Sequence, residues 1–321
     1  MKKIMLDTDI GCDCDDAGAL AILHRLCDRG EAELVSVTHC FATPFVAGCI
    51  DAINRFNKRE VPIGINYMRS SPDGGVYARD LCQRFENGYP PEKFYRKEIP
   101  DTLSVLRKNL AGAEDGSITF VVVGTLDSMV RLILSEPDSV SVLSGEELVE
   151  RKIGRTVIMG GRFFETWPMP IFPDGKCEGR EVDWEWNIKG SGYDVARTVF
   201  ERWRGELVLA SYEIGSYVKT LNGYHKYCSE ADPAAYAYLI HNGGTGRCSW
   251  DLCAVLEAVR PSRYWHYHEY GKINVDSELV TRWMPDRDGR HTYLIPKVDY
   301  ADIEAEIDRL VLGKNEFNVI E

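Results

Sequence analysis

Short apolar runs alternate along the chain with longer segments in which apolar residues recur at helical spacing. The apolar runs predict buried strands at 2–8, 33–39, 61–66, 117–124, 155–161 and 206–211. The longer segments predict helices at 15–27, 44–56, 125–137, 193–203 and 300–313. Strands separated by single helices favour a parallel sheet that is covered on both faces. We therefore predict an α/β fold with an open, mostly parallel, Rossmann-like sheet.

Two long segments interrupt this alternation. Residues 67–100 and 162–182 are rich in proline and glycine. Insertions of this length in a compact domain are often functional loops, so we expect both segments near a site. Neither resembles a flexible linker, and the chain has no internal repeat. We therefore expect one domain over residues 1–321.

Composition and charge narrow the class of partner. Apolar residues make up 44% of the chain and charged residues 27%, which is ordinary for a soluble globular protein. The net charge of −12 argues against nucleic acid or an anionic membrane as a partner, because basic faces bind both. No basic-then-apolar leader precedes the first strand, and no apolar run reaches the ~20 residues of a membrane span. We expect a cytoplasmic protein that acts on a small molecule.

The cysteines do not change this picture. Ten of them are scattered through the sequence without a compact disulfide framework, and we expect most to be small buried apolar residues. Cys12 and Cys14 form a CxC pair, but no second Cys/His pair lies at zinc-finger spacing. Structural zinc is therefore not expected.

The first strand runs into a stretch that is unusually rich in aspartate, LDTDIGCDCDD at residues 6–16. It contains five aspartates: Asp7, Asp9, Asp13, Asp15 and Asp16. A helix N-terminus favours a carboxylate by only about 0.3–1 kcal/mol, which accounts for one or two of them. Ligands gather at the carboxyl ends of parallel strands, and hard cations such as Ca²⁺ or Mg²⁺ prefer oxygen ligands. The cluster therefore predicts a metal site rather than a purely capping loop.

The same stretch resembles the N-terminal signature of the inosine-uridine preferring nucleoside hydrolase family, which reads roughly DTDxGxDDAxAL. Four later segments resemble further family motifs in the expected order: VVVGTLDSMVRLI (121–133), VIMGGRF (157–163), EWNIKGSGYDVARTVF (185–200) and RCSWDLCAVLEAVRP (247–261). The resemblance implies a calcium-dependent N-glycosidase that hydrolyses ribonucleosides. In such an enzyme the metal holds the ribose hydroxyls and a water, and an aspartate takes the water's proton. We also expect a homo-oligomer.

The resemblance also implies roles for the acids. Four aspartates fall at the family's metal-ligand positions: Asp9, Asp16, Asp127 and Asp251. The family uses a main-chain carbonyl at the position of Asp127, so that side chain need not bind metal. Between Asp9 and the acid pair there are two more residues than in the commonest form of the motif. Alignment from the helix makes Asp15 the general base and alignment from the strand makes it Asp13; we favour Asp15, which keeps the paired acids at the helix start.

Three candidate substrate contacts follow from the later motifs. Glu185 and Asn187 correspond to the family's ribose-binding pair, and two positions apart on one strand they would point to the same side. The alternative is a surface strand with Trp186 in the core. The family's Gly-Asn after the second strand is replaced by HCFATPF at 39–45. His39 at that strand end faces the site or is a buried structural residue.

The residue before Asp251 is Trp250, where many family members carry the histidine that protonates the leaving purine. A tryptophan stacks on a base, as in the purine-specific branch of the family, or belongs to the core. If Trp250 stacks on the base, solvent or a loop group such as Tyr77 or His241 supplies the proton. Glu213, after the strand at 206–211, is a further candidate for substrate contact, with helix capping as the alternative.

Two other functions remain open from the sequence. A first strand that ends in DxD is also typical of haloacid-dehalogenase-like phosphatases, in which an aspartate attacks phosphorus with the help of Mg²⁺. Those enzymes need a second acidic pair after a late strand, whereas SWDLCA offers a single aspartate. The non-enzyme alternative is a nucleoside- or sugar-binding protein that retains the metal site without turnover.

Overall fold

A computed structural model describes residues 1–70, 75–163 and 184–313 of the chain. Its centre is a ten-stranded sheet with the order β11-β10-β12-β6-β5-β4-β1-β2-β3, and β9 pairs with β12. The parallel strands are β1 (Lys2–Thr8), β2 (Ala32–His39), β3 (Ile63–Ile65), β4 (Ile118–Val122), β5 (Ile153–Met159), β6 (Leu207–Ala210) and β12 (His291–Pro296). Antiparallel strands extend one edge: β9 (Trp265–Tyr267), β10 (Gly271–Val275) and β11 (Thr281–Pro285).

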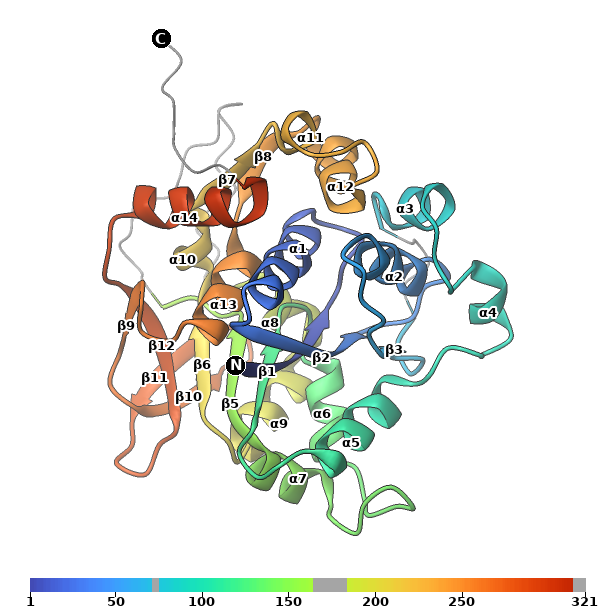
Figure 1. Cartoon of the computed structure of the whole chain (residues 1–321). Coiled ribbons are helices and arrows are strands. Elements are labelled where there is room, and N and C mark those ends of the chain that lie inside the picture. The colour runs from blue at the N-terminus through green and yellow to red at the C-terminus, as the bar shows by residue number, and fades with distance from the viewer. Residues whose placement is uncertain (71–74, 164–183, 314–321) are drawn as a thin grey trace.

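Helices cover both faces of the sheet (Figure 1). One face packs against α1 (Asp15–Asp28), α2 (Val46–Phe56) and α13 (Trp250–Val259), and α12 (Pro233–Asn242) and α14 (Tyr300–Leu312) pack against α1. The other packs against α5 (Thr102–Gly112), α6 (Asp127–Ile133), α7 (Gly145–Lys152) and α9 (Tyr193–Arg202). Strand β1 shows why two cores form: Ile4 and Leu6 belong to the first and Met5 to the second, because successive side chains point to opposite faces.

Shorter elements lie around one end of the sheet. They are α3 (Ala78–Arg84), α4 (Pro91–Tyr95), α8 (Trp186–Ser191), α10 (Tyr212–Ser216), α11 (Tyr224–Tyr227) and the hairpin of β7 (Lys219–Asn222) with β8 (Thr245–Cys248). In chain order α3, α8 and α10 come next after the parallel strands β3, β5 and β6. Among the described residues, no helix combines the length and apolar character needed to cross a membrane.

The predicted fold class is confirmed. Each strand predicted from an apolar run is present within a few residues, as are the five predicted helices. The segment 67–100 is less irregular than predicted, because it contains α3 and α4 and buries Tyr77 completely. Most of the segment 162–182 lies outside the described residues. The antiparallel edge β9–β11 was not predicted.

Candidate active site

A cavity of about 590 Å³ opens at the carboxyl ends of the parallel strands. This volume is within the roughly 300–1,000 Å³ typical of small-molecule sites. Its floor includes Val123, directly after β4, and Met159, the last residue of β5. Parallel pairing in register places these strand ends side by side with the end of β1. The sheet therefore brings the aspartate-rich loop and the later motifs to one place.

Three carboxylates meet at the bottom of this cavity. Asp15 and Asp16 open α1, and Asp251 lies in the first turn of α13; one carboxylate oxygen of each lies within 4.8 Å of the other two. All three residues are at most 4% exposed. The backbone N–H of Asp251 donates to Asp15 Oδ2 at 3.2 Å, and the Thr8 hydroxyl donates to Asp16. Packing of α1 against α13 thus holds acids that are distant in sequence in one cluster.

Burial and mutual repulsion make this cluster strongly basic. Loss of solvation raises the pKa of Asp15, Asp16 and Asp251 well above the ordinary value, and repulsion among the neighbouring carboxylates raises it further. Asp9, in the same cavity, has its pKa raised to about 7 by burial and by Asp13. Such a set of buried carboxylate oxygens fits a hard divalent cation, because the ion supplies the positive charge that the crowded carboxylates need.

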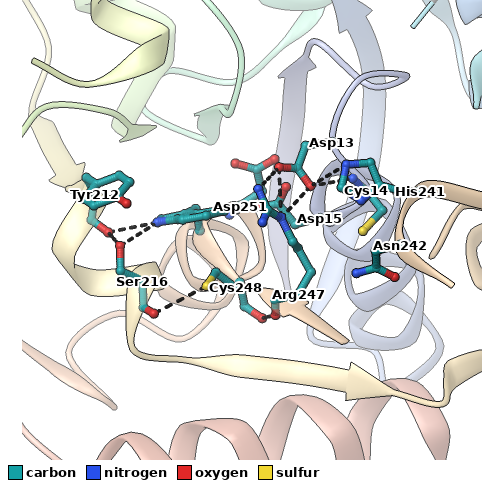
Figure 2. Close-up of polar contacts among 12 residues, drawn as sticks. Asp13, Cys14, Asp15, Tyr212, Ser216, His241, Asn242, Arg247, Cys248 and Asp251 are labelled. Atoms are coloured by element: carbon teal, nitrogen blue, oxygen red, sulfur yellow. Dashed lines mark hydrogen bonds and ion pairs between the residues drawn. The ribbon is translucent and has the colours of Figure 1, made fainter. Parts of the chain in front are cut away.

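Asp13 lines the same cavity and is bound by Arg247 on β8. Arg247 Nε lies 3.0 Å from both carboxylate oxygens of Asp13, and Nη2 lies 2.5 Å from Oδ2 (Figure 2). Burial alone would raise the pKa of Asp13, but the hydrogen bonds and charge of Arg247 outweigh it and lower the pKa. Asp13 is therefore kept ionised, and its carboxylate is already paired with the guanidinium of Arg247.

Two further predicted residues lie outside the described lining of the cavity. The Asp127 carboxylate accepts hydrogen bonds from Arg69 at 2.5 Å and Thr125 at 2.6 Å. His39 is completely buried, and its Nδ1 and Nε2 lie 2.6 Å and 3.1 Å from the carbonyl oxygens of Phe41 and Ile10. Its ring bridges the loops after β1 and β2. Of the two interpretations that the sequence left open for His39, this is the buried structural residue.

The predicted strand at Glu185-Trp186-Asn187 is wrong, because these residues begin helix α8. Glu185 is the N-cap, and its carboxylate accepts from the backbone N–H groups of Asn187 at 2.7 Å and Ile188 at 3.0 Å. A short polar segment is compatible with the first turn of a helix as well as with a strand, because its side chains can accept hydrogen bonds from the free backbone N–H groups at a helix start. Glu185 and Asn187 nevertheless both line the cavity, whereas Trp186 is 66% exposed and is no core residue.

Trp250 combines both interpretations considered for it. Its Nε1–H donates to the Tyr212 carbonyl at 2.9 Å and lies 3.0 Å from the Ser216 hydroxyl, as expected of a core indole. The ring also lines the cavity, stacks on the Tyr212 ring at 5.6 Å, and lies 4.9 Å from the Arg247 guanidinium. The indole is thus a part of the cavity wall that packs against Tyr212 and Arg247.

Glu213 lies behind the cavity wall rather than in its described lining. This buried carboxylate accepts from the backbone N–H of Phe163 at 3.0 Å and lies 3.7 Å from Arg162. Arg162 itself lines the cavity. Glu213 therefore contacts the loop after β5 and the arginine that borders the cavity.

Sequence reasoning missed the two arginines of the site. Arg162 and Arg247 both line the cavity, and each lies at an end of a segment that the sequence singled out for other residues. Arginines next to predicted ligands could have been recognised as site residues from the sequence, because buried acids require nearby positive charge and the chain has a net charge of −12. His241, from the last turn of α12, also lines the cavity.

Comparisons with known proteins bear on the fold. No family model matches the chain, and no curated protein matches it. Among solved structures, the inosine-uridine preferring nucleoside hydrolase from Bacillus anthracis is similar, with a TM-score of 0.66 and 19% identity over 98% of this chain and 100% of that chain. The purine-preferring ribonucleoside hydrolase from Gardnerella vaginalis gives a TM-score of 0.64 and 16% identity over 97% and 98% of the two chains.

A third structure of the same fold is the type III effector protein XopQ complexed with adenosine diphosphate ribose. It gives a TM-score of 0.63 and 14% identity over 97% of this chain and 92% of that chain. These likenesses confirm the fold that the sequence resemblance implied: the chain folds as nucleoside hydrolases do.

The close packing of α10 against α13 holds Trp250 and Asp251 in position, and a substitution at this contact can test it. A Cβ added to Gly215 would lie 2.3 Å from Trp250 Cα and 2.6 Å from its backbone nitrogen, whereas one added to Gly112 meets nothing within 4 Å. We expect Gly215→Ala to lower the free energy of unfolding by about 1–3 kcal/mol, because the backbone of α13 must move. Urea unfolding measures this. Gly112→Ala is the matched control, and equal behaviour of the two variants would contradict the prediction.

Proposed function

We propose that this protein is a nucleoside hydrolase, an enzyme that uses a divalent cation to cleave the N-glycosidic bond between ribose and a base. The observation that carries the proposal is the meeting of Asp15, Asp16 and Asp251 at the end of a parallel sheet. Asp9, Glu185 and Asn187 line the same cavity. Solved structures of the same fold include enzymes named for inosine, uridine and purine ribonucleosides, which supports a nucleoside as the substrate.

The clustered acids are the proposed site for the cation. Asp15, Asp16 and Asp251 would hold it, and Ca²⁺ is the ion we propose because every side-chain donor is a carboxylate oxygen. When bound, the ion supplies positive charge that orients ribose hydroxyls and makes water more acidic. Asp127 takes no part in this proposal through its side chain, which is bound to Arg69 and Thr125.

Asp9 is the general base that we propose. It lines the cavity and interacts with Asp16 without belonging to the cluster of three. Asp15, the base favoured from sequence, shares the cluster with Asp16 and Asp251, and Asp13 is occupied by Arg247. The carboxylate of Asp9 takes a proton from water as the water oxygen bonds to the anomeric carbon of the ribose.

Of the other residues that line the cavity, we assign some to binding the ribose and one to binding the base. Glu185 and Asn187 lie at the start of α8 on the floor of the cavity, where a carboxylate and an amide suit the ribose hydroxyls. Trp250 supplies an aromatic ring to the wall of the same cavity. Stacking on a nucleobase contributes about 1–3 kcal/mol per base, so this residue supports a purine nucleoside as the substrate.

Cation binding is tested by thermal unfolding of chelator-treated protein with and without added calcium. At a calcium concentration of 100 times Kd, the wild type should gain about 2.7 kcal/mol, and Asp251→Asn should gain far less. Without calcium at pH 8, Asp251→Asn should unfold at the same temperature as the wild type or higher, because one repelling carboxylate is gone. The exposed Asp302→Asn serves as the control. Equal stabilisation of Asp251→Asn and the wild type by calcium would contradict the assignment.

The base assignment is tested by activity on inosine. Asp9→Asn should lower kcat by roughly 10²–10⁴-fold while calcium still stabilises the variant, because an amide cannot accept the proton. Asp15→Asn should lose activity and calcium stabilisation together. The opposite pattern, in which Asp9→Asn retains turnover and Asp15→Asn loses turnover alone, would return the role of base to Asp15. Absence of hydrolysis by the wild type with any ribonucleoside would instead favour a binding protein.

A further inference from the structure

The leaving base needs a proton, and the residue before Asp251 cannot supply one. Trp250 carries an indole N–H that is bonded to the Tyr212 carbonyl and lies next to the Ser216 hydroxyl, and an indole does not release its proton at neutral pH. Tyr77 is also unsuited: it has no exposed surface, and its hydroxyl donates to the Asp13 carbonyl at 2.7 Å and accepts from Gly11 N–H at 3.1 Å. The proton must come from another group.

We propose that His241 is the general acid that protonates the departing base, and that Asp13, clamped by Arg247, positions it. The inference rests on the proposed function and deepens it. His241 is the one histidine among the described residues that line the cavity, and it comes from α12, an element outside the acid cluster. Its side chain is 18% exposed, so its ring is shielded from bulk water and still reachable from the cavity.

Two features place negative charge beside His241. Its Nε2 lies 3.7 Å from Asp13 Oδ1 (Figure 2). His241 also lies in the last turn of α12, and a helix C-terminus favours a positive side chain. Groups that lie near it also include the Cys14 thiol, from the start of α1, and Arg247, which binds Asp13 from β8.

Arg247 decides the role of Asp13. Asp13, Cys14 and His241 each offer an atom that could bind a metal, but both oxygens of Asp13 already accept hydrogen bonds from Arg247. The guanidinium therefore fixes the carboxylate in place beside the imidazole. At 3.7 Å the carboxylate is beyond hydrogen-bond distance of the ring, so it positions the histidine by its charge and by its fixed place in the cavity wall.

The proton balance of the reaction is then complete. The bond between the anomeric carbon and the base nitrogen breaks, and its electron pair leaves with the base. A ring N–H of His241 transfers its proton to that base. The water oxygen bonds to the anomeric carbon, and the proton of that water passes to Asp9. Solvent takes the proton from Asp9 and returns one to His241, so that one water is consumed in each turnover.

The test compares two leaving groups in the calcium-loaded enzyme. Inosine releases a base that needs a proton, whereas p-nitrophenyl ribofuranoside releases a stable anion that does not. We expect His241→Ala to lower kcat on inosine by roughly 10²–10⁴-fold and to leave kcat on the p-nitrophenyl compound close to the wild-type value. The activated substrate also reports whether the variant is folded and its acid cluster intact. His266→Asn, exposed on β9, is the matched control.

Asp13→Asn tests the positioning role. It should shift the ratio of the two rates in the same direction as His241→Ala but by less, and the double variant should lose no more than His241→Ala alone. Equal losses on both substrates, or no loss on inosine, would overturn the assignment of His241 while leaving the proposed function in place. A wild type that cleaves neither substrate would overturn the proposed function, and this inference with it.

Discussion

Repulsion among buried carboxylates is the constraint on which the site depends. Asp15, Asp16 and Asp251 are held together because α1 packs against α13, and the N-termini of both helices face the cluster. Each helix end stabilises a carboxylate by only about 0.3–1 kcal/mol, which is small beside the cost of burying several like charges. The contact between these helices is therefore compatible with ionised acids only when a cation lies among them. Without one, the cluster must hold protons.

The sequence predicts much of this arrangement because the signals are local or follow from sheet geometry. Apolar runs identify β1 to β6, and the rule that ligands gather at the carboxyl ends of parallel strands brings Asp9 and Asp16 to the site. The edge strands β10 and β11 were missed because GKINV and TRWMP have too few apolar residues to stand out. Helix α8 was missed because a cap such as Glu185 and a polar strand look alike over three residues.

The position of Asp13 could not be predicted, since its partner Arg247 is 234 positions away in sequence. The loop between Asp9 and Asp15 is longer than in the usual family motif, and the additional length brings Asp13 to Arg247. Tyr77 supports that loop by bonding both the Gly11 N–H and the Asp13 carbonyl. The segment 67–100, which interrupts the α/β alternation, thus acts by buttressing the aspartate-rich loop from outside the cavity.

The two halves of the cavity are built from different parts of the fold. The acids and the proposed sugar-binding residues lie on β1, α1, α8 and α13, close to the central sheet. Arg247 and His241 come from β8 and α12, beyond it. An ion pair that spans the halves, Asp13 with Arg247, joins the loop that carries the acids to β8. Under the proposed mechanism, substitutions of His241 on α12 would change how the leaving group is handled without altering the acid cluster. A shift of α13, by contrast, moves Trp250 and Asp251 together.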